Sequence, residues 1–412
     1  MNQPVKSLTA VSPVYPDGQK IDTVVIEYER ETDSTRAEGP QADAYEVTGR
    51  RIVRVYTNDA SQRSQAPKRG RYCILELDPR EEAAAVMQLE PLEFDEPGPH
   101  FHPDGSPVLP QAYRRPVREH VIQTREIAAA DGSPIPVWEA DTDQALQPVI
   151  DDFIQGQYED IPYSLYIPQT KKNAGFPLVV FLHDAGPNGS DPLLTLSQGN
   201  APTAFAAPRD QALHPAFVLA PQIPKEVHLT TDNNTCAPQI ETVKSLIDRI
   251  VSDYPVDPDR IYWAGQSQGT MAGFELARRY PGYFAAFLLA AGQWDAQAVG
   301  KACVCETFWM LSSDGDLKAN GGMCEIADAL ERNGARVGRY HWNAKWPREQ
   351  LELSVRAAAA DDFRIRHVTF TDHSVIPDGA DDNPGADHMA TWPVVYAIDA
   401  LRDWLFTQKR GL

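Results

Sequence analysis

The chain of 412 residues has no long hydrophobic run and little positive charge. No stretch reaches the roughly 18 uninterrupted apolar residues of a membrane-spanning helix, and the first residues lack the pattern of a secretory signal. Its 38 Lys and Arg against 58 Asp and Glu leave a formal net charge of −20, which disfavours nucleic acid and anionic membranes as partners because both would be repelled. We therefore expect a soluble, cytoplasmic protein that acts on a small molecule, with export of a processed form left open.

Cysteine is scarce as well. Five cysteines are few and odd in number, which is typical of a reducing compartment rather than of a disulfide framework. Cys303 and Cys305 have the wrong spacing for a zinc knuckle, and His100 and His102 have no third ligand beside them. We therefore expect no metal and no cofactor, while a bridge from Cys236 to Cys303 or Cys305 stays open if the chain is exported.

The hydrophobic pattern changes near residue 127. Before it, short alternating apolar runs lie among turn-forming PDG, TGR and KRG sequences, which predicts an antiparallel β-sandwich domain over residues 1–127. Only residues 81–89 have a helical pattern there, and the Pro-, Gly- and Asp-rich segment 95–110 predicts a long loop. The expected strands span residues 7–14, 21–28, 52–56, 72–77 and 117–126.

From residue 128 to 412, nearly solid apolar runs alternate with helical stretches. This pattern predicts an α/β domain in which helices cover both faces of a mostly parallel sheet. Functional residues are expected just after the strands, at their carboxyl ends. The expected strands are 178–182, 217–220, 261–264, 285–291 and 308–311, and the helices include 239–254, 271–280 and 322–333.

The sequence Gly-Gln-Ser-Gln-Gly at 265–269 follows one of these strands and precedes a helix. A Gly-x-Ser-x-Gly string occurs by chance in about one chain of this length in ten, so its strand-to-helix position carries the argument. In a nucleophile elbow the serine is strained, flanking side chains would collide with the neighbouring elements, and the helix N-terminus stabilises negative charge. Ser267 is therefore the candidate nucleophile.

A serine nucleophile needs a histidine base, and the histidine needs a carboxylate. In this fold the chain order is serine, acid, histidine. His388 is the preferred base because it lies just before an amphipathic C-terminal helix, and His373 is the alternative. His341 and His367 lie in apparent strands, where a structural role is expected.

Three aspartates after the late strands are candidates for the acid. Asp316 is preferred because it lies at the tip of the loop that must reach the histidine. Asp314 in the same loop and Asp295 after the preceding strand are the alternatives; the aspartates that are not the acid would shape turns or cap helices.

Two main-chain amides are expected to form the oxyanion hole. One is that of Gln268, and the other is that of Ala185 or Gly186 in the loop after strand 178–182, where small residues permit close approach. Trp342 and Trp346 either form part of a lid or acyl wall or pack an added helix. Four further side chains are expected near the substrate: Gln266, Trp294, His183 and Asp184.

Several stretches together resemble the esterase branch of the α/β-hydrolases, whose members are also called predicted peptidases. That family carries an immunoglobulin-like domain ahead of the hydrolase domain, and some relatives are similar to polyhydroxyalkanoate depolymerases or feruloyl esterases. The resemblance implies Ser267 as nucleophile, Asp316 as acid and His388 as base. It rests on residues 177–186, 214–224, 254–295 and 387–406, and more loosely on 7–29 and 50–59.

The sequence departs from that family at two places. His183-Asp184 stands where His-Gly is common, and Ser312-Ser313 stands where another His-Gly is common. Neither change removes a reacting group.

The leading hypothesis is a metal-independent serine carboxylesterase that hydrolyses short-chain or aryl esters through an acyl-enzyme. The alternatives are a serine peptidase acting on small peptides and an inactive homologue that binds glycan or protein. The N-terminal domain is the candidate surface for a homo-oligomer, although no residue there decides its role.

Overall fold

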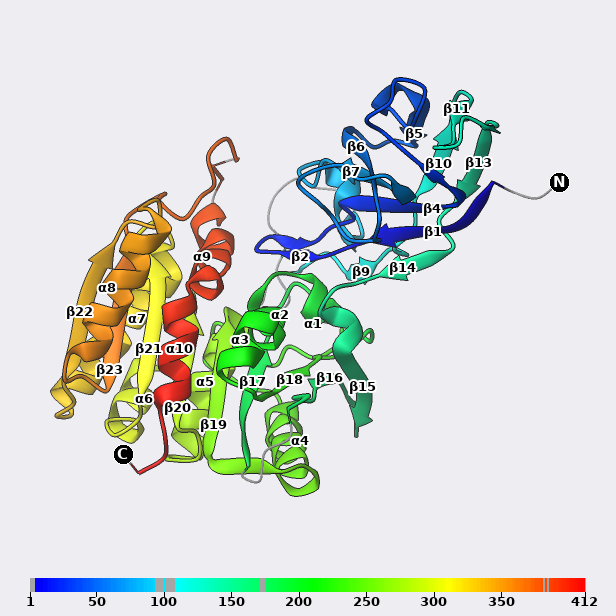
Figure 1. Ribbon diagram of the computed structural model, residues 1–412. Helices are drawn as coiled ribbons and strands as arrows, with labels where there is room; N and C mark the ends of the chain where they lie inside the picture. Colours follow the sequence, from blue (N-terminus) through cyan, green and yellow to red (C-terminus); the bar gives the residue numbers. More distant parts are fainter. Residues whose placement is uncertain are drawn as a thin grey trace. The chain divides into compact units, whose positions relative to one another are not determined.

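The computed structural model describes the chain except for residues 1–3, 93–99, 101–107, 171–174, 381, 384 and 412. The chain divides into two compact units, Met1–Gln88 with Arg114–Asp151, and Leu89–Tyr113 with Asp152–Leu412 (Figure 1). Most of the loop expected at 95–110, including His102, lies outside the described residues. Among the described residues, none of the helices is long and apolar enough to cross a membrane.

The first unit is a β-sandwich. Its larger sheet has the order β14-β1-β4-β7-β6 and its smaller sheet the order β13-β10-β5. Alternate residues of β4, namely Val24, Ile26 and Tyr28, are buried in the core that the two sheets share, as the period of a half-buried strand requires. The strands in this part of the chain are β1 (Val5–Val11), β2 (Val14–Tyr15), β3 (Gly18–Gln19), β4 (Thr23–Thr32), β5 (Tyr45–Val47), β6 (Ile52–Asn58), β7 (Gly70–Leu77), β8 (Met87–Leu89), β9 (Ala112–Arg114), β10 (His120–Gln123), β11 (Ile127–Ala128), β12 (Pro134–Ile135), β13 (Trp138–Asp141) and β14 (Gln144–Leu146).

The first unit runs on to Asp151, beyond the boundary expected at residue 127. β13 pairs with β10, and β14 pairs with β1. Neither β13 nor β14 has a fully buried residue, although Trp138 and Ala140 of β13 pack against the sandwich core. Both strands therefore give a weaker hydrophobic signal than the central strands. The helical pattern at residues 81–89 does not give one helix. These residues form a short 3-10 helix, Glu82–Ala84, which is followed by β8.

The second unit is an α/β domain built on a nine-stranded sheet with the order β15-β16-β18-β17-β19-β20-β21-β23-β22. The strands from β18 to β22 in this order are parallel, and β15 and β16 are antiparallel. This confirms the predicted fold class. The strands are β15 (Phe153–Tyr158), β16 (Ile161–Tyr166), β17 (Phe176–Leu182), β18 (Phe217–Pro221), β19 (Val256–Gln266), β20 (Ala286–Ala290), β21 (Phe308–Ser313), β22 (Val337–Trp342) and β23 (Ile365–Phe370).

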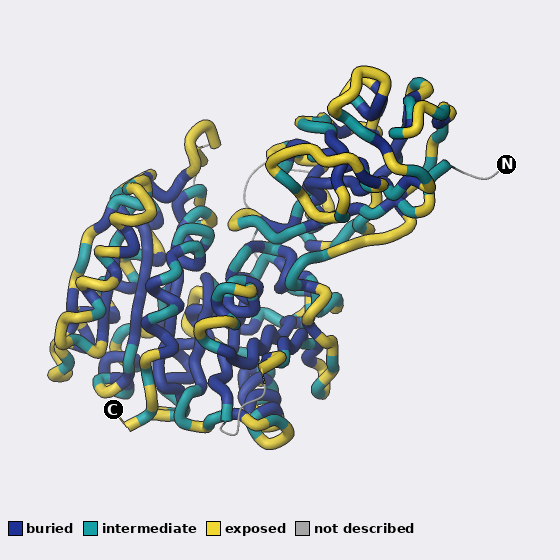
Figure 2. The backbone as a smooth tube through the Cα atoms, in the orientation of Figure 1, coloured by how far each residue is buried: buried dark blue, intermediate teal, exposed yellow. Residues whose placement is uncertain are grey.

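Helices cover both faces of this sheet. Leu178 and Val180 of β17 belong to a core shared with α4, α5 and α7, while Phe181 faces the opposite way and packs edge-on against Tyr396 of α9. The central strands are therefore buried throughout (Figure 2). The helices are α1 (Leu194–Ser197), α2 (Ala201–Ala206), α3 (Pro208–Leu213), α4 (Gln239–Asp253), α5 (Gln268–Arg279), α6 (Ala296–Ala302), α7 (Leu317–Arg332), α8 (Arg348–Ala360), α9 (Ala386–Ala397) and α10 (Asp399–Thr407).

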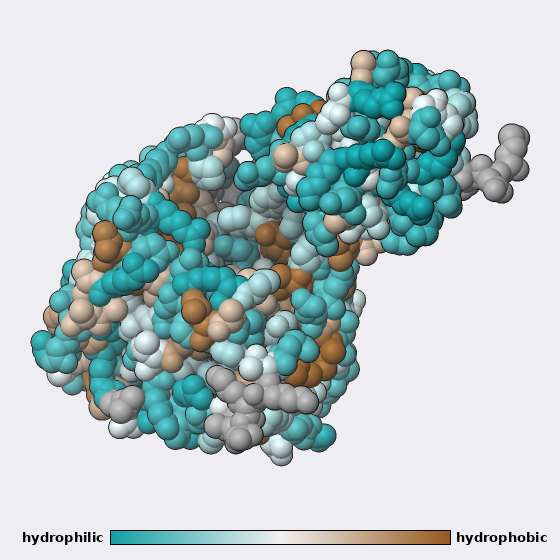
Figure 3. Space-filling view, in the orientation of Figure 1, coloured by the Kyte–Doolittle hydropathy of each residue, from teal (hydrophilic) through white to brown (hydrophobic). Residues whose placement is uncertain are grey.

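Two features of the sequence have a simple structural outcome. The C-terminal amphipathic stretch forms two helices, not one, because Ile398 leaves the helical conformation at φ −80° and ψ 108°. All five cysteines carry free thiols, so Cys236 forms no bridge to Cys303 or Cys305. The surface seen in Figure 3 is largely hydrophilic, in keeping with the net charge of −20.

A buried ion pair fastens α10 to α3. Arg402 donates from Nε and Nη2 to the two carboxylate oxygens of Asp210, at 2.6 and 3.0 Å. Its Nη1 donates to the carbonyl of Tyr396, and Nη2 also to Asp399. A guanidinium so enclosed depends on its carboxylate partners, because a buried charge without one is costly.

Asp210→Asn should therefore lower the free energy of unfolding by about 3 kcal/mol, because the Arg402 charge stays buried with only Asp399 to offset it. Urea unfolding followed by tryptophan fluorescence measures this, since seven of the eight tryptophans lie after residue 152. The matched control is Asp253→Asn, which breaks the exposed pair with Arg249 and should change the same quantity by less than about 1 kcal/mol. Equal effects of the two substitutions would contradict the stabilising role of the buried pair.

Candidate active site

Ser267 lies in a tight turn between β19 and α5. Its φ of 48° and ψ of −113° are uncommon for a residue with a side chain and mark local strain. A Cβ on Gly265 would lie 2.4 Å from the carbonyl oxygen of Gly269, and a Cβ on Gly269 would lie 2.0 Å from that of Leu182. Both glycines are therefore needed for α5 to begin this close to the sheet, which is the geometry of a nucleophile elbow.

The structure brings Ser267, His388 and Asp316 into one line of hydrogen bonds. His388 Nε2 accepts from Ser267 Oγ at 2.9 Å, and His388 Nδ1 donates to Asp316 Oδ2 at 2.5 Å. Asp316 caps α7, its other oxygen accepting from the amide of Ala319, and His388 lies in the first turn of α9. The side chain of Asp316 is 7% exposed and that of His388 is 28% exposed, so the carboxylate is enclosed while the imidazole is partly exposed to solvent.

The alternative acids and bases have other partners. Asp314 Oδ2 bonds His341 Nε2 at 2.8 Å. Asp295 caps α6 by accepting from two backbone amides. His373 pairs with Asp387 through Nδ1 at 2.7 Å. In the part of the chain that the structure describes, hydrogen bonding joins only His388 to Ser267 Oγ.

Two backbone amides near Ser267 are available to form an oxyanion hole. Among the described residues, the amides of Ala185 and Gln268 donate to no protein acceptor, and Gln268 begins α5. The amide of Gly186 instead donates to Asp184 Oδ1 at 2.8 Å. Of the two residues expected from the sequence, the structure therefore favours Ala185 over Gly186.

A cavity of about 400 Å³ lies beside these amides, within the second unit. One wall comes from residues 90–92 and 108–111 and is apolar except for Glu90 and Gln111, and the other is polar and comes mainly from residues 225–230. The side chains of Ser267, His388 and Asp316 are not among the residues that line this cavity, so Ala185 and Gln268 connect it to the candidate site. A larger groove of about 800 Å³, with lining residues from α8 and α10, contains neither these two amides nor those three side chains. The residues lining the smaller cavity are Glu90, Pro91, Leu92, Val108, Leu109, Pro110, Gln111, Ala185, Gly186, Asn188, Lys225, Glu226, His228, Thr230 and Gln268.

The four side chains expected near the substrate do not line this cavity. Gln266, Trp294, His183 and Asp184 are all buried, and each has a protein partner. Trp294 Nε1 donates to Glu275 at 3.0 Å, so its indole is fixed in the core rather than in a pocket. Trp342 is also buried and packs against other aromatic rings, which supports packing rather than an acyl wall.

His183 has a structural role beneath the site. Its Nε2 accepts from the amide of Ile223 at 3.0 Å, and its Nδ1 donates to the carbonyl of Asp184 at 2.5 Å. Burial lowers the pKa of His183, and this donor–acceptor pattern belongs to the neutral ring. The histidine therefore holds the backbone of the oxyanion loop.

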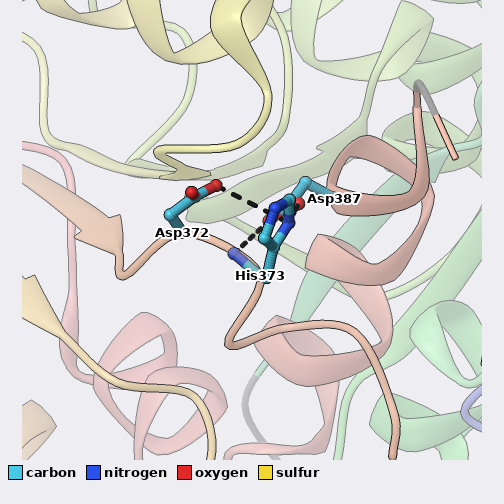
Figure 4. Close-up of side chains that lie close together, drawn as sticks. All are labelled: Asp372, His373 and Asp387. Atoms are coloured by element: carbon cyan, nitrogen blue, oxygen red, sulfur yellow. Dashed lines mark hydrogen bonds and ion pairs between the residues drawn. The ribbon is translucent and has the colours of Figure 1, made fainter. Parts of the chain in front are cut away.

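Asp387 is a buried carboxylate that the sequence did not single out. Its Oδ1 accepts from Ser313 Oγ at 2.5 Å and from the amide of His373 at 3.2 Å, and its Oδ2 accepts from His373 Nδ1 (Figure 4). Ser313 ends β21, three residues before Asp316, and Asp387 precedes His388. Asp387 therefore ties together the two segments that carry the acid and the base.

Asp387 and His373, together with Asp372, form the one group of described residues that could offer three ligand atoms to a metal ion. The candidate atoms of Asp372, His373 and Asp387 lie within 4.8 Å of one another (Figure 4). Asp372 and His373 are exposed, and His373 already pairs with Asp387. A metal ion would compete with this ion pair.

His373→Asn should lower stability most at acidic pH. Asparagine tolerates the φ of 57° at this position, and the hydrogen bond to Asp387 raises the pKa of His373. A group whose pKa rises on folding stabilises the fold below its unfolded pKa of about 6.5, and this contribution is lost as the pH rises through the folded pKa. The melting temperature of the variant, measured by circular dichroism, should fall below wild type at about pH 5.5 and approach it at about pH 8.5. A gap that does not change with pH would contradict the ion pair.

Comparison with known proteins agrees with this fold. Two family models match the chain, the esterase Ig-like N-terminal domain over residues 7–136 and the esterase PHB depolymerase model over residues 161–306. No curated protein matches at the level of sequence. The two family matches confirm the resemblance that the sequence showed.

Solved structures give the same result. One described as a thermostable esterase is 25% identical, with a TM-score of 0.78 over 98% of this chain and 100% of that one. An acetyl xylan esterase from Aspergillus awamori (15% identical, 44% of this chain and 80% of that one, TM-score 0.34) and a feruloyl esterase module from Clostridium thermocellum (13% identical, 60% and 85%, TM-score 0.39) are too distant to carry an argument.

The family matches span residues 7–136 and 161–306, and the similarity to the thermostable esterase covers 98% of the chain. These findings support hydrolysis of ester bonds. The chain thus carries a region that matches the esterase Ig-like N-terminal domain ahead of an α/β-hydrolase domain that matches the esterase PHB depolymerase model.

Proposed function

We propose that the protein is a serine carboxylesterase that cleaves short-chain or aryl esters through an acyl-enzyme. The observation that carries the proposal is the continuous path from Ser267 Oγ to His388 Nε2, at 2.9 Å, and from His388 Nδ1 to Asp316 Oδ2, at 2.5 Å. A serine hydroxyl becomes an effective nucleophile at neutral pH when a histidine accepts its proton and a carboxylate orients that histidine.

In the first half of the reaction, Ser267 Oγ attacks the ester carbonyl carbon while His388 Nε2 takes the hydroxyl proton. The carbonyl electron pair moves to oxygen and forms a tetrahedral oxyanion, which the amides of Ala185 and Gln268 stabilise by hydrogen bonding. Asp316 keeps the Nδ1 proton in place and stabilises the imidazolium. Collapse of the intermediate breaks the bond to the alcohol oxygen, which leaves with the proton from His388.

The second half repeats these steps with water. His388 accepts a proton from a water molecule while the water oxygen attacks the acyl carbon. The proton then passes from His388 to Ser267 Oγ when the carboxylic acid leaves. The start of α5 adds the positive end of a helix dipole beside the developing oxyanion. Each half therefore uses the same three side chains and the same two amides.

The size of the cavity beside the amides supports the proposal that the substrates are small esters. Its volume of about 400 Å³ is at the small end of ligand sites. The apolar wall at Pro91, Leu92 and Leu109 offers contacts for an alkyl or aryl group, and the polar wall at Lys225 and Glu226 offers contacts for a more hydrated part of the substrate.

Ser267→Ala should lower kcat for 4-nitrophenyl acetate by about 10⁶-fold, because no other described side chain takes the place of its hydroxyl. Release of nitrophenolate measures this, and circular dichroism checks that the variant is folded. Turnover close to wild type would remove serine catalysis from consideration. The wild-type protein, assayed on short peptide anilides as well as on the ester, separates an esterase from a peptidase, which is the remaining alternative in this fold.

Asp316→Asn should lower kcat by about 10⁴-fold, because the amide cannot hold the productive tautomer of His388. Asp314→Asn is a matched control two residues away in the same loop, where the carboxylate pairs with His341 instead. It should change kcat by less than about threefold. If Asp314→Asn were the more damaging substitution, the assignment of the acid would be wrong.

A further inference from the structure

The oxyanion loop contains a buried carboxylate with no cationic partner in the described part of the chain. Asp184 is 8% exposed, and its two oxygens accept from uncharged donors: Oδ1 from the amide of Gly186 and Oδ2 from Gln266 Nε2, both at 2.8 Å. A buried carboxylate held only by neutral donors is costly to keep charged. Its position beside a site that stabilises an oxyanion adds to this cost, since like charges repel.

The two donors belong to the two segments that form the oxyanion hole. Gly186 follows Ala185 in the loop after β17, and Gln266 directly precedes Ser267 in the elbow. The hydrogen bond from the Gly186 amide to Asp184 Oδ1 closes a turn of the type that aspartate side chains form two residues ahead, with Ala185 inside it. The hydrogen bond from Gln266 then joins this turn to the elbow.

Close packing reinforces this arrangement. A Cβ on Gly186 would lie 2.8 Å from Asp184 Oδ1, so the carboxylate lies directly against the backbone of the loop. The carbonyl of Asp184 is fixed as well, because His183 Nδ1 donates to it while Nε2 accepts from Ile223. Both the side chain and the backbone of Asp184 are therefore held in place.

We propose that Asp184 is a positioning residue that locks the oxyanion loop to the nucleophile elbow, so that the amides of Ala185 and Gln268 converge on one oxygen atom. This inference rests on the proposed serine esterase function. The carboxylate acts through the geometry of its two hydrogen bonds and not through its charge. It also determines which amide serves the hole, because it occupies that of Gly186 and leaves that of Ala185 available.

Asp184→Ala tests the role directly. It removes both hydrogen bonds, and kcat for 4-nitrophenyl acetate should fall on the order of 10–100-fold, because oxyanion donors lose their alignment. KM should change by less than about threefold, since the amides act mainly on the transition state. Binding of a trifluoromethyl ketone, which Ser267 converts into a charged hemiketal, should weaken by the same factor as kcat/KM.

Asp184→Asn separates geometry from charge. Its Oδ1 still accepts from Gly186, and its Nδ2 donates to Gln266 once that side-chain amide turns over, so most of the activity lost in Asp184→Ala should return. Gln266→Leu tests the same link from the other side, and in combination with Asp184→Ala it should cause little further loss, because the two residues act as one unit. The matched control is Asp295→Ala. It likewise removes two hydrogen bonds, here both from backbone amides, but it should leave kcat unchanged.

Each outcome decides the inference. A kcat for Asp184→Ala within about threefold of wild type would overturn it, as would an Asp184→Asn variant as impaired as Asp184→Ala, which would make the charge the important property. If Asp184→Ala does not fold, Gln266→Leu decides alone, and a kcat within about threefold of wild type would then overturn the inference. If Ser267→Ala keeps full turnover, the proposed function itself fails; if Ser267→Ala is inactive while the variants at 184 and 266 are not, only the positioning role fails.

Discussion

The close approach of the start of α5 to the sheet is the constraint on which the active site depends. Gly265 and Gly269 allow it, because a side-chain carbon at either position would overlap backbone atoms. The strain at Ser267 costs about 1–3 kcal/mol, and it is offset by hydrogen bonds around the turn: the amide of Ser267 donates to the carbonyl of Ala290, and Thr270 Oγ1 donates to the carbonyls of Gly265 and Ala290. The position of the serine, the exposure of its hydroxyl and the direction of the neighbouring amide all follow from this contact.

The proposed reacting residues could be predicted from the sequence because each has a local signal. Ser267 lies between a solid apolar run and a helix, Asp316 follows another such run, and His388 begins a helical stretch. The oxyanion hole could be predicted only as far as a choice between two neighbouring residues. That choice depends on the rotamer of Asp184, which occupies one amide and leaves the other available, and a rotamer inside a turn leaves no periodic trace in the sequence.

The parts of the fold that were harder to predict share a physical cause. β13 and β14 continue the sandwich without a fully buried residue, and they are only four and three residues long. Such short strands are too brief for hydrophobic alternation to mark them clearly. The pocket walls at residues 90–92 and 108–111 are joined to the active site only in three dimensions. The four side chains expected near the substrate are buried and hydrogen-bonded within the protein. Position near a strand end does not distinguish a side chain that faces a cavity from one that faces the core.

The separation of 121 residues between Ser267 and His388 has a consequence for the protein during its synthesis. Once α5 has been made, the chain holds the proposed nucleophile and both proposed oxyanion amides, and Asp316 comes next. The base comes last, and it reaches Ser267 only when α9 packs against the finished sheet. Because domains fold as they emerge from the ribosome, the nascent hydrolase domain can acquire its sheet and its elbow while its serine is still unreactive. Under the proposed mechanism, the order of the residues delays catalysis until the domain is nearly complete.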